Sequence, residues 1–220
     1  MRGRSSNLWT FDRVSSLPSA PLFGEPLPVA PSQPVLDFLA RRRSASALTL
    51  TAPAPSEAQL ADLIRIAARV PDHGKLAPWR FVILEGEGKT AFAARLEALA
   101  ASRPDAAKLV AKLGKLKAPP LAVAVIASPK AGGGVPAWEQ VMSAGAVCTL
   151  LLQAAGAMGY GANWITDWYA YDREALAVLG LAEGERVAGF VFIGTATEAP
   201  AERVRPDETA LTTRWFPPSP

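Results

Sequence analysis

The most constraining part of this sequence is an apolar run at Leu121–Ile126, followed after a short loop by a longer apolar segment at about Pro136–Met158. A short run without polar residues is typical of a strand that is buried on both faces. A helix that is apolar around most of its circumference is typical of the centre of a protein. The sequence therefore predicts a central strand and a central helix, joined by a glycine-rich loop at Ala131–Val135.

The same region contains the most membrane-like window of the chain, Ala144–Ala162. This window consists mostly of Ala, Gly and Leu, with Gln153 inside it and Asn163 just beyond it. A single window of small residues favours a packed core helix over a membrane span. Met1–Asp12 begins with arginines, but no apolar region of the length found in signal peptides follows it. We therefore expect a cytoplasmic protein that does not bind a membrane.

The composition is that of an ordinary globular protein with one domain. Its 220 residues suffice for a full core, and 50% hydrophobic with 20% charged residues exclude disorder of the whole chain. A net charge of +3 suits a protein that handles anionic cofactors, and it is too small to predict a nucleic-acid partner. One cysteine and one histidine exclude an internal disulfide and a metal site built from these residues. The cysteine, Cys148, lies in the apolar helix, which favours a buried inert thiol over a nucleophile.

The chain divides near residue 33. Residues 1–33 are rich in proline and serine and lack hydrophobic periodicity, which predicts an extended or mobile arm. Trp9 and Phe11 could anchor this arm on a surface. Residues 34–220 form the predicted globular domain, whose C-terminal arm from Glu198 onward contains arginines and an aromatic pair.

Hydrophobic periodicity predicts the remaining elements. A capping-box pattern, Ser56 to Gln59, begins a helix that must end before Pro71, because the residue before a proline is pushed out of the helical region. Helices and strands alternate without strict βαβ order, which favours an α+β fold. Further helices are predicted around Val35–Leu39, Phe92–Leu99, Asp105–Lys117 and Asp172–Leu179, and further strands at Trp79–Leu84, Tyr160–Thr166 and Val187–Gly194.

The only histidine, His73, lies in a polar loop between Pro71 and Pro78. Its neighbours Asp72 and Lys75 are residue types that occur in turns and reach ligands. Without a histidine–cysteine cluster or spaced histidines, an enzyme with this sequence needs a bound cofactor, which the protein orients and surrounds with charge.

Five segments, spread over residues 35–195, are informative about function. They are Arg41–Ser44 (RRRS), Arg69–His73 (RVPDH) running into Pro78–Phe81 (PWRF), Trp138–Gly145 (WEQVMSAG), Gly159–Thr166 (GYGANWIT) and Phe192–Thr195 (FIGT). In this order and spacing they resemble the nitroreductase family, specifically its short bacterial branch of NAD(P)H nitroreductases. The resemblance implies a central, mostly antiparallel sheet flanked by helices, non-covalently bound FMN, and an intertwined homodimer with FMN in the groove between the subunits.

The resemblance also implies which residues bind the cofactor. It places Arg42, Arg43 and Ser44 on the phosphate and ribityl region of FMN, and it places Arg69 and His73 on the flavin. Trp164, Ile165 and Thr166 are expected alongside the ring system, where Asn163 and Thr166 offer polar groups for the ring edge. A basic residue near the C-terminus often reaches the phosphate in this family, and Arg205 is favoured here over Arg203. The segment comprising Ala154, Ala155, Gly156, Ala157, Met158 and Gly159 resembles the part of the branch that is linked to nicotinamide cofactor binding.

Several of these residues have an ordinary structural alternative. Arg42 and Arg43 could form the solvated end of a helix, where cations are favoured, although guanidinium groups also fit phosphate well. His73 could simply stabilise its loop. The run Gly132–Gly134 lacks the lysine–serine ending and the spacing of phosphate-binding motifs, so it is interpreted as a flexible loop. Trp79 is expected in the core, and Lys112, Lys115 and Lys117 are expected on a solvated helix face.

The loop before Trp79 departs from the family pattern. Many members have serines, an asparagine and a glutamine in this loop, whereas this chain has Asp72, His73, Lys75 and Ala77. Because these side chains differ in chemical type, the acceptors of well-studied family members are not carried over to this chain.

The sequence thus predicts an FMN-dependent NAD(P)H oxidoreductase in which the flavin, and no side chain, performs the chemistry. By the resemblance, hydride passes from NAD(P)H through FMN to a small acceptor such as a nitroaromatic or a quinone, by a ping-pong mechanism. Two alternatives stay open: a flavin-binding or storage protein with negligible turnover, and a related flavoenzyme that removes halogen or fragments flavin. The short stretch Ala118–Trp138 leaves little room for the lid that the second alternative usually needs.

Overall fold

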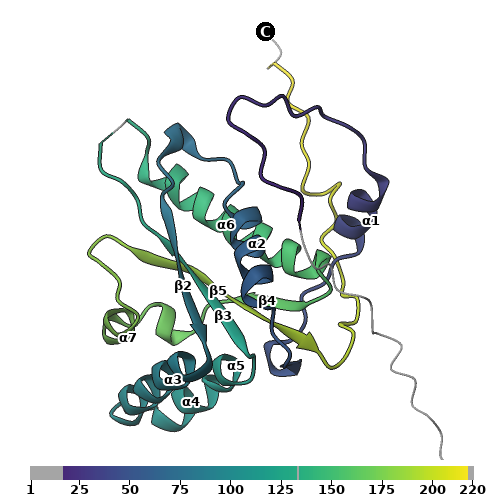
Figure 1. The fold of residues 1–220 in the computed structure, drawn as a ribbon. Helices are drawn as coiled ribbons and strands as arrows, with labels where there is room; N and C mark the ends of the chain where they lie inside the picture. The colour runs from purple at the N-terminus through teal and green to yellow at the C-terminus, as the bar shows by residue number, and fades with distance from the viewer. Residues whose placement is uncertain (1–16, 133, 218–220) are drawn as a thin grey trace, which may run out of the picture.

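A computed structural model describes residues 17–132 and 134–217. Its strands form one antiparallel sheet in the order β1-β5-β3-β2, and β4 also pairs with β5 (Figure 1). An antiparallel sheet flanked by helices confirms the predicted α+β class. The strands are β1 (Leu50–Thr51), β2 (Trp79–Glu85), β3 (Leu121–Ala127), β4 (Gly161–Ile165) and β5 (Arg186–Ala196). The helices are α1 (Gln33–Arg41), α2 (Glu57–Ala67), α3 (Gly86–Ala101), α4 (Ala106–Lys112), α5 (Gly114–Lys117), α6 (Ala137–Ala157) and α7 (Arg173–Val178), with short 3-10 helices η1 (Ala47–Thr49), η2 (His73–Lys75) and η3 (Trp168–Ala170).

Strand β3 is the buried centre of the sheet, as its apolar run predicts. Every residue from Leu121 to Ala127 is at most 1% exposed, and the strand lies between β2 and β5. Because side chains alternate along a strand, the sheet separates two hydrophobic cores. Ala122, Ala124 and Ile126 belong to one core, and Leu121, Val123 and Val125 belong to the other.

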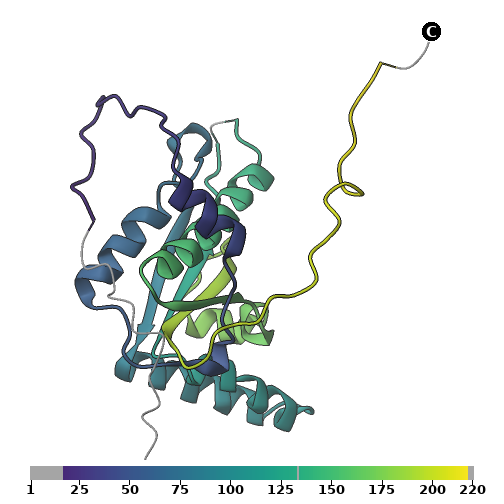
Figure 2. The same ribbon diagram turned by 90° about the vertical axis from the view of Figure 1, so that its right-hand side faces the viewer.

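Helices cover both faces of the sheet (Figures 1 and 2). Residues of α3, α5 and α7 pack into the core that contains Phe190 and Phe192 of β5. Residues of α2 and α6 pack into the other core, with Val191 and Ile193. The alternating side chains of β5 therefore connect to both layers of helices, which is the arrangement that a sheet covered on both faces requires.

Helix α6 is the predicted central helix. Val147, Cys148, Leu151 and Ala155 are fully buried, and the helix packs against α2 and the sheet. Burial raises the pKa of the Cys148 thiol to about 12, so this side chain stays protonated at neutral pH, as expected for an inert thiol. By length and composition, α6 is the one helix of the described residues that could cross a membrane, but half of that apolar window is buried inside the protein. This packing accounts for its apolar composition.

The predicted capping signals form as expected. At the start of α2, the Gln59 N–H donates to the Ser56 hydroxyl at 3.3 Å, and the Ser56 N–H donates to the Gln59 side chain at 3.0 Å. At the start of α7, the Asp172 carboxylate accepts from two backbone N–H groups, each at 3.0 Å. Such caps satisfy N–H groups that have no partner within the helix, so they fix where α2 and α7 begin.

Two features differ from the sequence prediction. The lysine-rich helix predicted over Asp105–Lys117 is divided into α4 and α5 at Leu113, directly before Gly114. Glycine is a poor helix former, and the fully buried Leu113 anchors the division in the core. Strand β1, only two residues long, was not predicted, because a segment of that length is too short to show a period.

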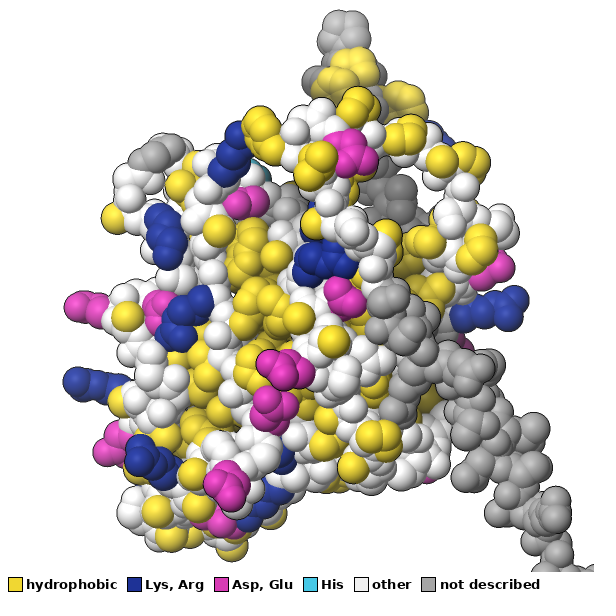
Figure 3. Space-filling view, viewed as in Figure 1, with side chains coloured by type: hydrophobic (Ala, Val, Ile, Leu, Met, Phe, Trp, Pro, Cys, Tyr) yellow, Lys and Arg dark blue, Asp and Glu magenta, His cyan; other side chains and the backbone are white. Residues whose placement is uncertain are grey.

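The two terminal segments lie outside the helical layers (Figure 2). Residues 17–32 contain neither helix nor strand and touch α2 through bonds from the Leu17 N–H to Asp62 and from Arg65 to the Pro18 carbonyl. Apolar side chains follow both segments at the surface, as Figure 3 shows. The boundary at residue 33 and the mobility of the arm stay predictions. Met1–Asp12, with Trp9 and Phe11, lies outside the described residues, as does Gly133 of the glycine run.

Candidate functional site

A pocket of about 600 Å³ opens at the edge of the sheet where β1, β4 and the end of β5 meet. A volume of this size falls in the range of small-molecule sites. Three stretches and one further helix form its wall. The lining residues are Arg43, Ser44, Ala45, Ser46, Ala47 and Thr49 after α1, Asn163 and Ile165 of β4, Glu198, Ala199, Pro200 and Ala201 after β5, and Lys115 of α5.

The local structure explains why these stretches meet. Helix α1 ends at Arg41, and the next residues run extended beside β4, with the Ala45 N–H donating to the Ala162 carbonyl at 3.0 Å. The side-chain amide of Asn163 donates in turn to the Ala45 carbonyl. Because side chains alternate along β4, Asn163 and Ile165 both face the pocket.

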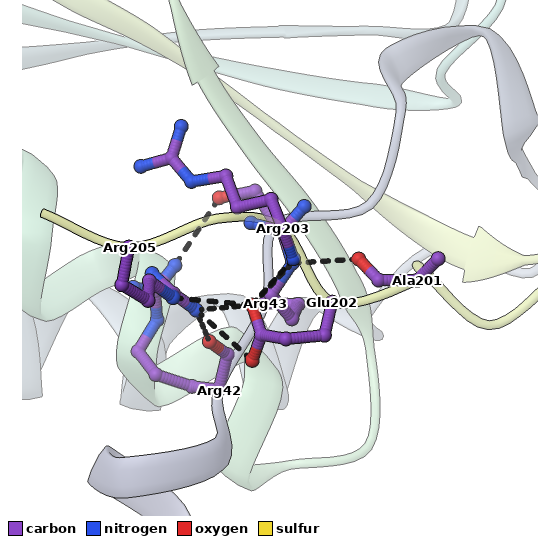
Figure 4. A network of polar contacts seen from close by, with 7 residues as sticks. Arg42, Arg43, Ala201, Glu202, Arg203 and Arg205 are labelled. Carbon is purple, nitrogen blue, oxygen red and sulfur yellow. Dashed lines mark hydrogen bonds and ion pairs between the residues drawn. The ribbon is translucent and has the colours of Figure 1, made fainter.

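Guanidinium groups from two distant parts of the chain converge around Arg43, which lines the pocket (Figure 4). Arg43 Nε donates to the Ala201 carbonyl at 2.9 Å, and Arg205 Nη2 lies 3.5 Å from the Arg42 carbonyl. Arg42 Nη2 donates to the Ser44 hydroxyl at 3.2 Å. The structure thus brings together four of the residues expected at the phosphate: Arg42, Arg43, Ser44 and Arg205.

A carboxylate lies among these arginines. Glu202 is 3.1 Å from Arg205 Nη2 and 3.7 Å from Arg43 Nε, and it accepts from the Arg203 N–H at 2.7 Å. The pKa of Glu202 lies below its ordinary value, chiefly because of the Arg203 N–H and also because of the charges of Arg205 and Arg43. The arginine cluster is therefore a site that already stabilises one anionic group.

The pocket wall also contains an acceptor without a partner. Asn163 Oδ1 is buried and has no hydrogen bond among the described residues, although the amide nitrogen of the same side chain is bonded. A buried acceptor that stays unpaired is costly. Its position at the pocket is consistent with a ligand that donates an N–H or O–H.

Arg69 and His73 do not line this pocket. Arg69 is exposed just after α2, and His73 Nε2 lies 3.7 Å from Glu139 at the start of α6. Their loop directly precedes β2. The first residue of β2 pairs with the end of β3, which pairs in turn with the beginning of β5, so the loop lies at that end of the sheet. The pocket lies at the other end of β5, where β1 pairs (Figure 1). The two groups of expected cofactor residues are therefore separated by the length of the sheet within one chain.

The loop that contains His73 has a fixed conformation. The Asp72 carboxylate accepts from the N–H groups of Leu76 and Ala77 at 3.1 and 2.9 Å. Lys75 and Ala77 have positive φ values of 58° and 43°, which are uncommon for residues with a side chain. Asp72 thus holds together a turn that presents His73 at the surface.

The three residues expected along the flavin ring point in different directions. Ile165 lines the pocket. The Trp164 indole instead lies over Gly189 of β5, where its Nε1 donates to the Ala188 carbonyl at 3.3 Å. Thr166 accepts from the Tyr171 hydroxyl at 2.8 Å. Of these three residues, Ile165 is the one whose side chain can contact a ligand in the pocket of the same chain.

The segment expected to bind the nicotinamide cofactor forms the end of α6 and the turn after it. Ala154, Ala155 and Met158 are buried in the core, whereas Ala157 and Gly159 are exposed. Gly156 lies against the ring of Phe38 of α1, so closely that a Cβ added at Gly156 would lie 3.2 Å from the ring. This segment can therefore meet a ligand chiefly through Ala157 and Gly159.

Several pocket residues, Lys115 among them, were not identified from the sequence. Lys115 is exposed, as expected for a solvated face, but it also lines the pocket. It is one of several lysines in α4 and α5, and nothing in the sequence distinguishes it from the lysines that only face solvent. Asn163 was expected to offer a polar group near the ring edge, and it lines the pocket. The described residues contain no group of three or more potential metal ligands.

Comparison with known proteins gives a consistent result. Residues 39–195 match the model of the nitroreductase family. The chain is 36% identical over 181 residues to YdjA of Escherichia coli K12, whose name describes an NAD(P)H nitroreductase, with 81% of this chain and 97% of YdjA aligned. A nitroreductase-like family protein from Bacillus cereus superposes with a TM-score of 0.73 at 21% identity, covering 86% of this chain and 98% of that one. A nitroreductase from Bacteroides fragilis with bound FMN superposes with a TM-score of 0.63 at 20% identity, covering 84% and 100%.

Proposed function

The chain belongs to the nitroreductase family, and on that basis we propose that it is an FMN-dependent NAD(P)H oxidoreductase. Bound FMN would supply the redox chemistry, as the carrier of hydride between NAD(P)H and an acceptor such as a nitroaromatic or a quinone. The observation that supports this function most directly is the pocket beside β4, which Arg43 lines and near which Arg42 and Arg205 approach each other. The chain itself binds and orients the reactants, and no side chain is assigned to proton or hydride transfer.

The arginine side of the pocket fits a phosphate. Arg43 offers a guanidinium group, Ser44 offers a hydroxyl, and Arg205 approaches from the C-terminal segment. Guanidinium groups bind phosphate through charge-assisted hydrogen bonds in a fixed planar geometry. We therefore assign Arg42, Arg43, Ser44 and Arg205 to the phosphate and ribityl end of FMN.

The β4 side of the pocket fits the polar edge of a flavin. Asn163 Oδ1 is the unpaired acceptor described above, Ile165 provides an apolar contact, and Lys115 provides a cation on the same wall. A few placed polar groups in an otherwise apolar pocket are typical of cofactor sites. We assign these three residues to the ring end, with the backbone of Trp164 and Thr166 beside it.

The position of Arg69 and His73 supports a homodimer. Both are expected to contact flavin, yet within one chain they lie at the opposite end of the sheet from the pocket. A second copy can bring them to the pocket, so that each FMN lies between two subunits. Exposed apolar side chains offer the surface for such an interface: Val35, Leu36 and Leu39 of α1, Trp138 and Met142 of α6, and Leu211, Trp215 and Phe216 of the C-terminal segment.

The remaining assignments follow from this arrangement. NAD(P)H and the small acceptor enter the same groove in turn, and Ala157 and Gly159 are the exposed part of the segment assigned to the nicotinamide cofactor. We place the protein in the cytoplasm, where NAD(P)H is available.

The spectrum of the purified protein tests the function. Protein prepared without added cofactor should be yellow and should release FMN, not FAD, on denaturation. It should oxidise NADH or NADPH with a quinone or a nitro compound, and light scattering should give about twice the chain mass. A colourless protein that does not bind added FMN would end the proposal, whereas bound FMN without turnover would indicate a storage protein.

A further inference from the structure

Glu202 is the one acidic side chain among the arginines assigned to the phosphate, in the part of the chain that the structure describes. Its carboxylate contacts Arg205 at 3.1 Å and Arg43 at 3.7 Å, and it also accepts from the Arg203 backbone (Figure 4). Both a carboxylate and a phosphate present anionic oxygens, and a guanidinium group donates charge-assisted hydrogen bonds to either of them. Glu202 and a ligand phosphate therefore use the same donors.

The surroundings of Glu202 show that its carboxylate can leave these donors. Its side chain is 60% exposed, and its residue lies in a segment after β5 that has no regular secondary structure. Exposed ion pairs contribute little to stability, because water solvates both charges when they separate. The stronger attachment of this segment does not involve the carboxylate, since Arg43 donates to the Ala201 carbonyl at 2.9 Å. The segment can stay in place while the Glu202 side chain moves.

We propose that Glu202 is an internal competitor of the cofactor phosphate, which determines how strongly the site prefers a phosphorylated flavin. This inference rests on the proposed function. Binding of FMN exchanges one anion for another at Arg43 and Arg205. Without a ligand, the carboxylate offsets part of the positive charge of Arg43 and Arg205. With FMN, the phosphate displaces the carboxylate, and the pocket tolerates the exchange because Glu202 faces solvent.

The proposal predicts a specific difference between FMN and riboflavin, which share the ring and differ in the phosphate. Glu202→Gln removes the competing charge and keeps the size of the side chain. Its affinity for FMN should rise by about fivefold, the upper range for exposed ion pairs, while its affinity for riboflavin should stay unchanged. Glu202→Asp keeps the charge and should resemble the wild type.

Glu198→Gln is the matched control. Glu198 lies on the same segment and lines the pocket, and no ion pair joins it to Arg43 or Arg205 in the described structure. If the effect came only from removing negative charge near the pocket, Glu198→Gln would increase FMN affinity as much as Glu202→Gln. Under the proposal, its increase is clearly smaller.

The measurement uses the full-length protein. Holoprotein with FMN, and the same protein reconstituted with riboflavin, are diluted, and the recovery of flavin fluorescence gives the dissociation constant of each. A wild-type protein that binds neither flavin would refute the proposed function itself. If the wild type binds FMN, four results would overturn the present inference alone: unchanged FMN affinity in Glu202→Gln, weaker FMN affinity, an equal gain for riboflavin, or an equal gain in Glu198→Gln. A gain confined to FMN supports it.

Discussion

The centre of the sheet and the pocket differ in how they are encoded. Strand β3 is a continuous apolar segment and helix α6 is mostly apolar, and each is defined by its own local pattern. The pocket joins the stretch after α1, two residues of β4, a lysine of α5 and the segment after β5, and its contacts are polar and partly exposed. Buried apolar contacts stabilise a fold strongly, whereas exposed polar contacts contribute little. Substitutions in the first region should therefore change stability, and substitutions in the second should change ligand affinity.

The largest effect is expected in the core. Leu151 of α6 is fully buried, so Leu151→Ala should lower the free energy of unfolding by about 2–5 kcal/mol through lost burial and a cavity. Leu22→Ala is the control, because Leu22 is 80% exposed, and its change should stay within about 0.5 kcal/mol. Urea denaturation measures both. A loss of less than about 1 kcal/mol for Leu151→Ala would show that α6 is not the centre of the fold.

The next effect concerns the pocket and separates Arg43 from His73. Charge-assisted hydrogen bonds are worth about 1.5–3 kcal/mol, so Arg43→Ala should weaken FMN binding by roughly one to two powers of ten. His73 offers one neutral donor or acceptor, so His73→Ala should bind FMN only modestly less well but change the rate of reduction by NAD(P)H. FMN titration and rapid-reaction kinetics test both variants.

Arg41→Ala is the matched control for this pair. Arg41 is the last residue of α1, is exposed and does not line the pocket, so its loss should change FMN affinity by no more than about twofold. If His73→Ala lost FMN as severely as Arg43→Ala while its reduction rate stayed normal, the division of roles between the two residues would be wrong.

The same contrast explains which features the sequence could predict. The elements were found because amphipathic helices impose a period on the chain, as in α2, and because buried elements are apolar runs, as in β3 and α6. Lys115 and Glu202 could not be found in this way. Both α5 and the segment after β5 approach the stretch after α1, and this contact depends on the tertiary fold, not on a local sequence pattern. Arg42, Arg43 and Ser44 came only from the family resemblance, because a basic helix end is by itself an ordinary solvated surface.

Trp164 shows the limit of the resemblance as well. The family pattern places this residue beside the flavin, but it does not specify where the side chain points. In the structure the indole covers Gly189, and a Cβ added there would lie 1.8 Å from Trp164 Nε1. The position of the ring thus depends on a glycine more than twenty residues away, on the neighbouring strand.

Gly189→Ala tests that dependence and should have a smaller effect than Leu151→Ala. The added methyl group must displace the indole, which should destabilise the protein by about 1–3 kcal/mol and change its tryptophan fluorescence. Gly88→Ala is the control, because a Cβ at Gly88 of α3 meets nothing within 4 Å. Alanine is the better helix former, so this control should be neutral or slightly stabilising. An unchanged fluorescence spectrum for Gly189→Ala would show that Trp164 does not cover this glycine.

The smallest effect compares two arginine–carboxylate pairs. Glu185, unlike Glu202, belongs to the fold: its carboxylate accepts from Arg80 Nε at 2.8 Å and Arg80 Nη2 at 2.6 Å, which joins the start of β2 to the turn before β5. The Arg80 hydrogen bond lowers the pKa of Glu185 from 4.5 to about 2. A depressed carboxylate pKa stabilises the folded state above the unfolded value, and this contribution is lost as the pH falls from about 4.5 toward 2.

Glu185→Gln should therefore cost about 1 kcal/mol at pH 7, since Arg80 is partly exposed and water screens the pair. The difference from the wild type should shrink as the pH falls from about 4.5 toward 2, because there the wild-type carboxylate loses its advantage over a neutral side chain. Glu183→Gln, an exposed neighbour without an ion pair in the described structure, should show no such dependence. Urea unfolding at several pH values measures all three proteins. If Glu202→Gln showed the same pH-dependent loss, its carboxylate would be part of the fold, and the contrast between the core and the pocket would fail.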